Sequence, residues 1–176
     1  HAQRGLPARI IAKMNSLVDR ELIEALYRAS QAGVKIDLIV RGICCLRPGV
    51  PGVSEGITVR SVVDRFLEHS RIFYFENACQ PEIFVGSADW MPRNFHRRVE
   101  VMIPIEEQAL RTRLIEVLSI TAGDTIKGWV LRPDGSYGRV QPKSGVTPLR
   151  SQQRFLEMAR DRVKEAEVAA RSSKRF

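Results

Sequence analysis

Three places in the chain carry side chains that could act on phosphate groups. Arg41 directly follows an apolar run, His69 lies in a second stretch, and the loop 86–98 holds three arginines. A guanidinium can grip a phosphate through two parallel hydrogen bonds. An imidazole can move a proton near neutral pH, and its ring nitrogen can attack phosphorus. These residue types therefore indicate phosphate binding or phosphoryl transfer.

Each place also has an ordinary structural interpretation. Arg41 lies at the end of a predicted buried strand, where an ion pair with an acidic residue would also satisfy it. His69 follows an apolar stretch, where a histidine is often a satisfied core residue. The arginines of loop 86–98 equally suit a solvated basic face. From the residues alone, both interpretations stay open.

The elements ahead of Arg41 form a predicted β-α-β unit. Residues 8–14 read as a strand, and a polar cap at 15–19 begins an amphipathic helix that ends at Gly33. Residues 34–40 then alternate into an apolar run, as a buried strand does. Such a unit implies two parallel strands. The Pro- and Gly-rich loop 47–56 follows the second strand, at the edge where open α/β sheets bind ligands.

The rest of the chain is predicted to alternate short strands with helices, so the fold class is α/β. Aromatic and β-branched runs indicate the strands, and apolar spacing indicates the helices. The predicted strands are 57–60, 71–75, 82–86, 99–103, 128–131 and 137–140. Strands 71–75 and 82–86 are expected to form one hairpin, and strands 128–131 and 137–140 another. The predicted helices are 62–69 (two turns), 105–120 and the tail that follows the linker 141–148.

Composition narrows the partners to anions. The 176 residues include 28 basic and 20 acidic side chains, a net charge of +8. Nucleic acid, lipid headgroups, nucleotides and other phosphates would all be attracted to such a surface. No apolar run approaches the ~20 residues that a membrane span needs. Because the chain begins at His1 and not at Met, we expect it to be a piece of something longer.

The three cysteines predict no metal site. Cys44, Cys45 and Cys79 lack the spacing of zinc ligands. The adjacent pair is expected to behave as small buried hydrophobic residues. An odd number of cysteines without a secretion signal fits a reducing, cytoplasmic setting.

A short pattern resembles the half-site of the phospholipase D superfamily, which usually reads His-x-Lys, then Asp, then Gly-Ser-x-Asn. Here the sequence has His69-x-Arg71, then Asn77, then Gly86-Ser87-x-Asp89. Arg71 replaces the lysine and Asn77 stands near the usual aspartate. These departures argue against phosphodiesterase chemistry.

Longer strings are similar to the C-terminal catalytic domain of bacterial polyphosphate kinase. They are 9–19, 41–49, 65–71 and 87–94, within a resemblance that spans roughly residues 5–140. The resemblance implies a phospholipase D-like domain, with a mixed β-sheet flanked by helices and a C-terminal helix. Residues 1–145 would be that domain, as the second of two half-sites, and 146–176 a basic helical tail.

The resemblance implies that the family moves the terminal phosphate of ATP reversibly onto polyphosphate, through a phosphohistidine in a preceding half that this chain lacks. His69 matches a second catalytic histidine, which also contacts the nucleotide. Arg41 and Arg98 match basic residues that bind the nucleotide phosphates. Magnesium is expected to accompany ATP or ADP. The isolated chain is therefore predicted to be inactive.

Roles follow from the chemistry of phosphoryl transfer, which depends mainly on positioning and charge neutralisation. Arg41 and Arg98 would hold non-bridging oxygens, and His69 would donate a hydrogen bond or proton to the leaving oxygen. Arg71 and Glu68 are the candidates for setting the tautomer of His69.

The expected partners are ATP or ADP, polyphosphate, the preceding domains of the same polypeptide and further copies of the full enzyme, with no specific nucleic acid. The expected location is cytoplasmic, and peripheral contact with the inner membrane is compatible with it. Three alternatives stay open: a basic nucleic-acid-binding module, a phospholipase D-like phosphodiesterase that acts as a dimer of half-sites, and an assembly role.

Overall fold

The computed structural model describes residues 1–142 and 144–173, with the side chains of 169 and 171–173 excepted. The strands in this range are β1 Arg9–Met14, β2 Lys35–Val40, β3 Ile57–Val62, β4 Arg71–Phe75, β5 Glu82–Gly86, β6 Met102–Pro104, β7 Gly128–Leu131 and β8 Tyr137–Arg139. The helices are the 3-10 turn η1 Ala2–Arg4, α1 Arg20–Gln31, α2 Pro92–His96, α3 Gln108–Ala122 and α4 Ser151–Ser173.

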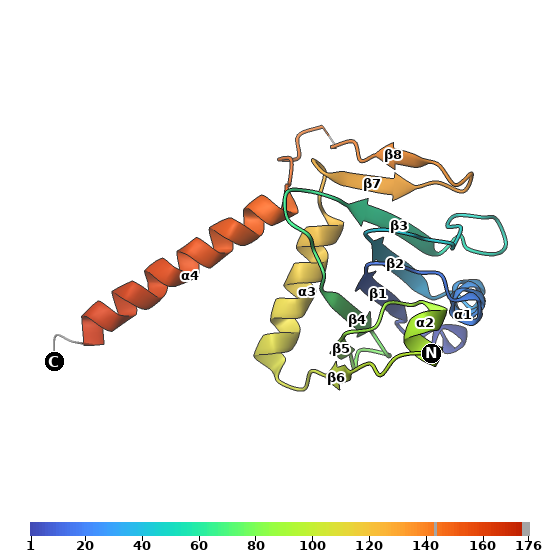
Figure 1. Cartoon of the computed structure of the whole chain (residues 1–176), viewed down its shortest axis with the longest axis horizontal. Coiled ribbons are helices and arrows are strands. Elements are labelled where there is room, and N and C mark those ends of the chain that lie inside the picture. Colours follow the sequence, from blue (N-terminus) through green and yellow to red (C-terminus); the bar gives the residue numbers. More distant parts are fainter. Residues whose placement is uncertain (143, 174–176) are drawn as a thin grey trace.

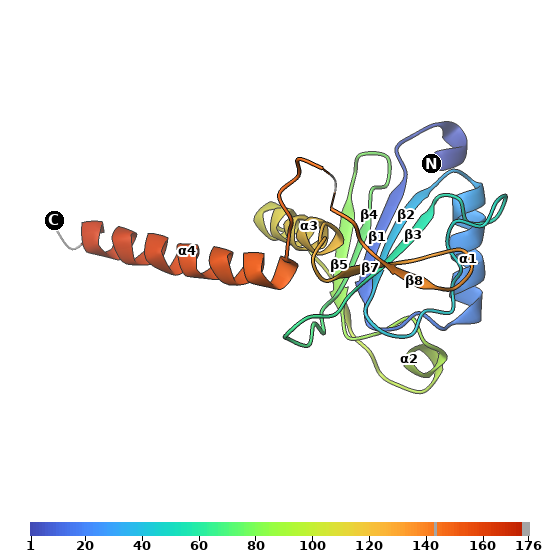
Figure 2. The ribbon, with the colours of Figure 1, turned by 90° about the horizontal axis from the view of Figure 1, so that it is seen from above.

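One mixed sheet organises the domain, in the order β6-β5-β4-β1-β2-β3-β7-β8. The three strands β1, β2 and β3 run parallel, and all other neighbours run antiparallel. Figure 2 shows α1 on one face of the sheet and α3 on the other. The α/β class, the parallel β1–β2 pair and both hairpins are thus confirmed.

Local chemistry fixes the predicted helix between β1 and β2. The side chain of Asp19 caps α1 by accepting a hydrogen bond from the Leu22 amide at 3.0 Å. Ile23 and Leu26 face the core. Gly33, with a φ of 94°, follows the helix and turns the chain into β2.

The core lies mainly between α1 and the sheet. Strands β1, β2 and β3 supply most of its buried aliphatic side chains. The rings of Phe73 and Trp90 stack there, with centroids 5.3 Å apart. The backbone carbonyl of Trp90 also accepts hydrogen bonds from the amides of Val18 and Asp19, so the loop after β5 is bonded to the residues just before α1.

The predicted two-turn helix over 62–69 is wrong. Strand β3 continues to Val62, and residues 63–70 have neither helical nor strand structure. The apolar side chain of Leu67, which suggested the helix, is 71% exposed. A residue far along the chain holds this segment instead, because the side chain of Gln152 hydrogen bonds to both the backbone amide and the backbone carbonyl of Phe66. Local periodicity cannot reveal such contacts.

Two smaller expectations also differ from the structure. The loop 86–98 contains the short helix α2, and the strand expected over 99–103 is the shorter β6. Cys44 is half-buried, but Cys45 is exposed, so the expectation of a buried pair is wrong for Cys45.

Helix α4 projects away from the sheet, as Figures 1 and 2 show. Its first turn is held firmly: the carboxylate of Asp124 accepts hydrogen bonds from the amide and hydroxyl of Ser151, both at 2.7 Å. Arg150, just before the helix, forms an ion pair with Asp64 at 2.7 Å. None of the described helices combines the length and apolar character that a bilayer crossing requires.

Candidate functional site

Topology brings the three predicted places to one edge of the sheet. Strands β1 and β2 are parallel, and their carboxyl ends lead into Asn15 and Arg41. Strand β4 is antiparallel to β1, so it begins at this edge, directly after His69 and Ser70. Strand β5 is antiparallel to β4, so it ends here, and Asp89 follows it. The edge is therefore the candidate site.

Asp89 is the centre of a buried polar network at this edge. Its carboxylate receives two hydrogen bonds from Arg71, at 2.9 and 3.2 Å. It receives two more from Asn15, one from the backbone amide at 2.7 Å and one from the side chain at 3.2 Å. Burial opposes ionisation of Asp89, but the hydrogen bonds from Arg71 and Asn15 outweigh it and lower the pKa of the carboxyl. Asp89 is thus held as a carboxylate.

Arg41 is half-buried, and a neutral amide orients it. Its Nε donates to Oδ1 of Asn15 at 3.0 Å. Its backbone carbonyl accepts a hydrogen bond from the Ser61 hydroxyl at 3.1 Å. Among the described residues, the Arg41 guanidinium has no carboxylate partner, so the structural ion pair considered from the sequence is absent there. The guanidinium therefore keeps its positive charge available for an anion.

His69 is exposed, and its neighbours fix its backbone. The carbonyl of His69 accepts a hydrogen bond from Arg71 Nη1 at 2.9 Å. Glu68 lies 3.7 Å from the ammonium of Lys13. Within the described part of the chain, neither Arg71 nor Glu68 hydrogen bonds to the imidazole of His69.

Arg98 is exposed and follows the short helix α2. Arg98 and Arg71 both help to lower the pKa of Glu100, although hydrogen bonds from Ser87 and Asn94 are the larger causes. The charges of both arginines thus act on Glu100, and Ser87 belongs to the Gly-Ser pair singled out in the sequence. His69 and Arg98 are both exposed, so neither is locked in the hydrophobic interior.

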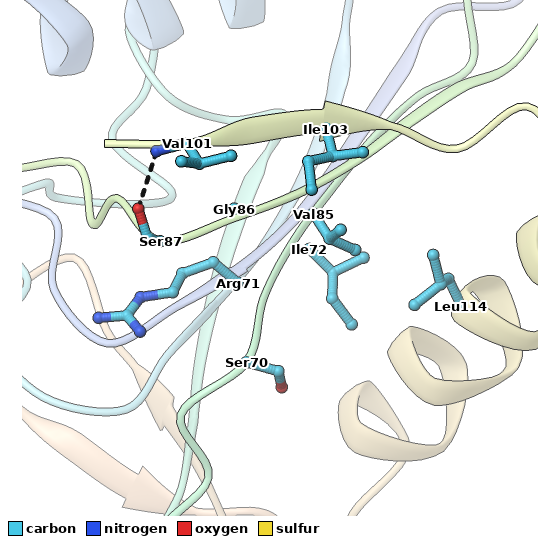
Figure 3. Close-up of a pocket in the computed structure, with 9 residues that line it drawn as sticks. All are labelled: Ser70, Arg71, Ile72, Val85, Gly86, Ser87, Val101, Ile103 and Leu114. Carbon is cyan, nitrogen blue, oxygen red and sulfur yellow. Dashed lines mark hydrogen bonds between the residues drawn. The ribbon is translucent and has the colours of Figure 1, made fainter. Parts of the chain in front are cut away.

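An apolar hollow of about 370 Å³ adjoins this network. Figure 3 shows that Ile72, Ile103 and Leu114 cluster on one side, while the guanidinium of Arg71 extends away from them. The hollow lies between strands β4, β5 and β6 and helix α3, and its remaining lining residues are Ser70, Val85, Gly86, Ser87 and Val101. It borders the charged edge but contributes few charges of its own.

Two residues at this edge, Asn15 and Lys13, are not among the candidates that the sequence predicts. Asn15 was interpreted as part of a helix cap, whereas Asp19 caps α1 and Asn15 links Arg41 to Asp89. Lys13 was counted only as a strand residue. A lysine inside an apolar strand was the available signal, since a buried ammonium requires partners.

The arrangement suits phosphate binding better than metal binding. Arg41 presents a cation at the same sheet edge as the exposed His69, Arg98 is a second exposed cation, and Arg71 is already neutralised by Asp89. The described residues contain no cluster of three or more His, Cys, Asp or Glu side chains placed to hold a metal ion.

Comparisons with known proteins agree with the strings singled out in the sequence. The family model described as "Polyphosphate kinase C-terminal domain 2" matches residues 1–152. A polyphosphate kinase of Thermosynechococcus vestitus is 59% identical over 145 residues, which are 82% of this chain and 20% of that protein. One of Rhodopirellula baltica is 51% identical over 172 residues, which are 98% of this chain and 20% of that protein. The chain thus spans about a fifth of the curated relatives it matches.

Solved structures show the same relationship. The crystal structure of polyphosphate kinase from Porphyromonas gingivalis aligns with a TM-score of 0.84 at 42% identity, over 90% of this chain and 25% of that one. The phospholipase D family member Nuc from Salmonella typhimurium aligns with a TM-score of 0.54 at 15% identity, over 74% of this chain and 86% of that one. The second likeness shows the fold alone, and it confirms the predicted phospholipase D-like architecture.

Proposed function

The chain belongs to the polyphosphate kinase family, and we propose that it provides nucleotide-phosphate contacts and a second catalytic histidine for reversible transfer of the terminal phosphate of ATP to polyphosphate. Most of each curated relative lies outside the region matched here. The proposal therefore assigns this chain one wall of a site that is completed by preceding domains of a longer polypeptide.

The observation that supports the proposal most strongly is that Arg41 is oriented but not neutralised. Its guanidinium is oriented by the neutral side chain of Asn15, and no carboxylate neutralises it within the described residues. It lies at the same sheet edge as the exposed His69. A preoriented, unneutralised arginine at the same sheet edge as an exposed histidine supports phosphoryl transfer, which depends on charge neutralisation and positioning.

The proposed transfer proceeds in two displacements. A histidine in the preceding half attacks the γ-phosphorus of ATP, a nitrogen–phosphorus bond forms, and the bond from phosphorus to the bridging oxygen of ADP breaks. The terminal oxygen of polyphosphate then attacks the phosphohistidine and frees the histidine. Arg41 and Arg98 hold non-bridging oxygens, and His69 donates a hydrogen bond or proton to the departing ADP oxygen. Magnesium enters with the nucleotide, held by phosphates and water.

The phosphodiesterase alternative fits the site less well. In the phospholipase D pattern a lysine follows the histidine, and here Arg71 stands in its place. Arg71 is bound by Asp89 through two hydrogen bonds and also by the carbonyl of His69. Its charge serves the network inside this chain, which leaves Arg41 as the better candidate for phosphate.

The test is ATP-dependent polyphosphate synthesis by the enzyme that contains this chain. His69→Ala should reduce the turnover by at least ~100-fold, as expected for loss of a general acid. His96→Ala is the matched control, because His96 lines a separate hollow between α1 and α2 with Asp19 and Leu22. Equal turnover in the two variants would remove His69 from the mechanism. The isolated chain, with ATP and magnesium, should form no polyphosphate, and chain growth by it would refute the need for an external nucleophile.

A further inference from the structure

Lys13 is a charged residue in the middle of the sheet. It lies on β1, paired with Ile39 of β2 on one side and with Ile72 of β4 on the other. Only 4% of the residue is exposed. Burying an ammonium is costly unless it is paired and hydrogen bonded, so its partners indicate what it does.

The ammonium of Lys13 holds both residues that flank His69. Its Nζ donates to the hydroxyl of Ser70 at 2.8 Å and to the carbonyl of Ser70 at 3.3 Å. It lies 3.7 Å from the carboxylate of Glu68. Burial lowers the pKa of Lys13, and the charge of Glu68 opposes that effect.

The segment that Lys13 holds has little other support. Residues 63–70 belong to no helix or strand. Within the described part of the chain, the hydrogen bonds and ion pairs of residues 67–70 are those from Lys13 to Glu68 and Ser70 and the one from Arg71 to the carbonyl of His69. Two cations thus hold the backbone around His69, one from β1 and one from β4.

Lys13 also connects this segment with the nucleotide side of the site. Lys13, Arg41 and Glu68 line one small internal cavity of about 10 Å³. Such a space holds about one water molecule, so the three side chains face one small shared space. A shift of Lys13 would move the backbone of His69 relative to Arg41.

We propose that Lys13 is a positioning residue, which fixes the backbone of residues 68–70 and so sets where the imidazole of His69 lies relative to Arg41. The catalytic consequence rests on the proposed function of His69. The structural part, which is the ordering of residues 68–70 by a buried ammonium, does not depend on it.

Backbone order tests the structural part directly. In nitrogen-15 relaxation measurements on this chain, the amides of residues 68–70 should show order parameters near ~0.85 in the wild type and below ~0.6 in Lys13→Met. The amides of α1 should be unchanged. Lys35→Met is the matched control, because Lys35 is an exposed strand lysine on β2, and it should leave residues 68–70 ordered.

Ser70 provides a second test that spares the core. Ser70→Ala removes the hydroxyl that accepts from Lys13 and should loosen residues 68–70, whereas Ser70→Thr keeps a hydroxyl and should restore their order. If Lys13→Met fails to fold, this pair decides the question. Unchanged order in Ser70→Ala, or in a folded Lys13→Met, would overturn the proposal.

Kinetics test the catalytic consequence in the complete polyphosphate kinase. Ser70→Ala should lower kcat about 10-fold and Lys13→Met about 100-fold, with KM for ATP changed less than about 2-fold, because misplacing a catalytic group costs rate more than binding. Ser70→Thr should recover kcat. Loosened residues with unchanged kcat would refute the catalytic role of Lys13. A wild-type enzyme that makes no polyphosphate would instead refute the proposed function and leave the order measurements valid.

Discussion

The ion pair between Arg71 and Asp89 is the most informative place to perturb the fold of the site. Their side chains are 12% and 7% exposed, and two hydrogen bonds of 2.9 and 3.2 Å join them. Asp89→Asn keeps the size of the side chain and an oxygen for Asn15, but it leaves the guanidinium of Arg71 buried without a counter-ion. Removing one partner of a buried pair costs about 3–5 kcal/mol. We expect a loss of about 3 kcal/mol in the free energy of unfolding.

The matched control is Asp37→Asn. Asp37 also pairs with an arginine, Arg9, at 2.6 Å, but the arginine and aspartate side chains are 48% and 30% exposed. Exposed pairs contribute about 0–1 kcal/mol. The two substitutions are chemically identical, so the difference between them isolates the effect of burial.

Urea denaturation followed by tryptophan fluorescence measures both variants. Trp90 is buried, so it reports on loss of the core. With a denaturant slope of about 2 kcal/mol per molar, Asp89→Asn should lower the midpoint by about 1.5 M and Asp37→Asn by less than about 0.5 M. Equal midpoint shifts would show that the Arg71–Asp89 pair is not the buried centre of the site.

Three further outcomes are expected. Because the pKa of Asp89 is lowered on folding, the contribution of Asp89 to stability is present at neutral pH and is lost as the pH falls below about 4. The urea midpoint should therefore drop below this pH in the wild type, and less steeply in Asp89→Asn. Parallel drops in the two proteins would contradict this. Burial raises the pKa of the Cys44 thiol to about 11. A thiol reagent at pH 8 should therefore modify the exposed Cys45 and Cys79 quickly and Cys44 at least ~10-fold more slowly. Equal rates at the three cysteines would be inconsistent with the burial of Cys44. Asp124→Ala removes two hydrogen bonds at the base of α4 and two in the turn that follows α3, and it should lower the free energy of unfolding by about 3 kcal/mol. A loss below about 1 kcal/mol in calorimetry would contradict this structural role of Asp124.

Sequence patterns were sufficient where local chemistry determines the structure. The polar helix start over 15–19, the glycine at position 33 and the apolar run 34–40 predicted the β-α-β unit and therefore the edge where Arg41 lies. The aromatic run 71–75 predicted β4. These signals are read within a few residues, so no knowledge of distant contacts was needed.

Local sequence patterns failed where contacts between distant residues determine the structure. The apolar residues near Leu67 resembled a helix, but Gln152, more than 80 positions away in sequence, holds this segment in an irregular form. The bridge of Asn15 between Arg41 and Asp89 joins three places that only the sheet topology brings together. The partners of Lys13 were likewise invisible in the sequence, because residues 68–70 approach β1 only after β4 pairs with it.

Turnover of Arg41 variants tests the central claim most directly. In ATP-dependent polyphosphate synthesis by the enzyme that contains this chain, Arg41→Ala should reduce the rate by at least ~100-fold, because a preoriented charge at the phosphate is lost. Arg47→Ala removes an exposed arginine of the following loop, whose guanidinium donates to the carbonyl of Asp134, and should change the rate less than about 2-fold. Equal rates for the two variants would contradict the assignment of Arg41 to the nucleotide phosphates.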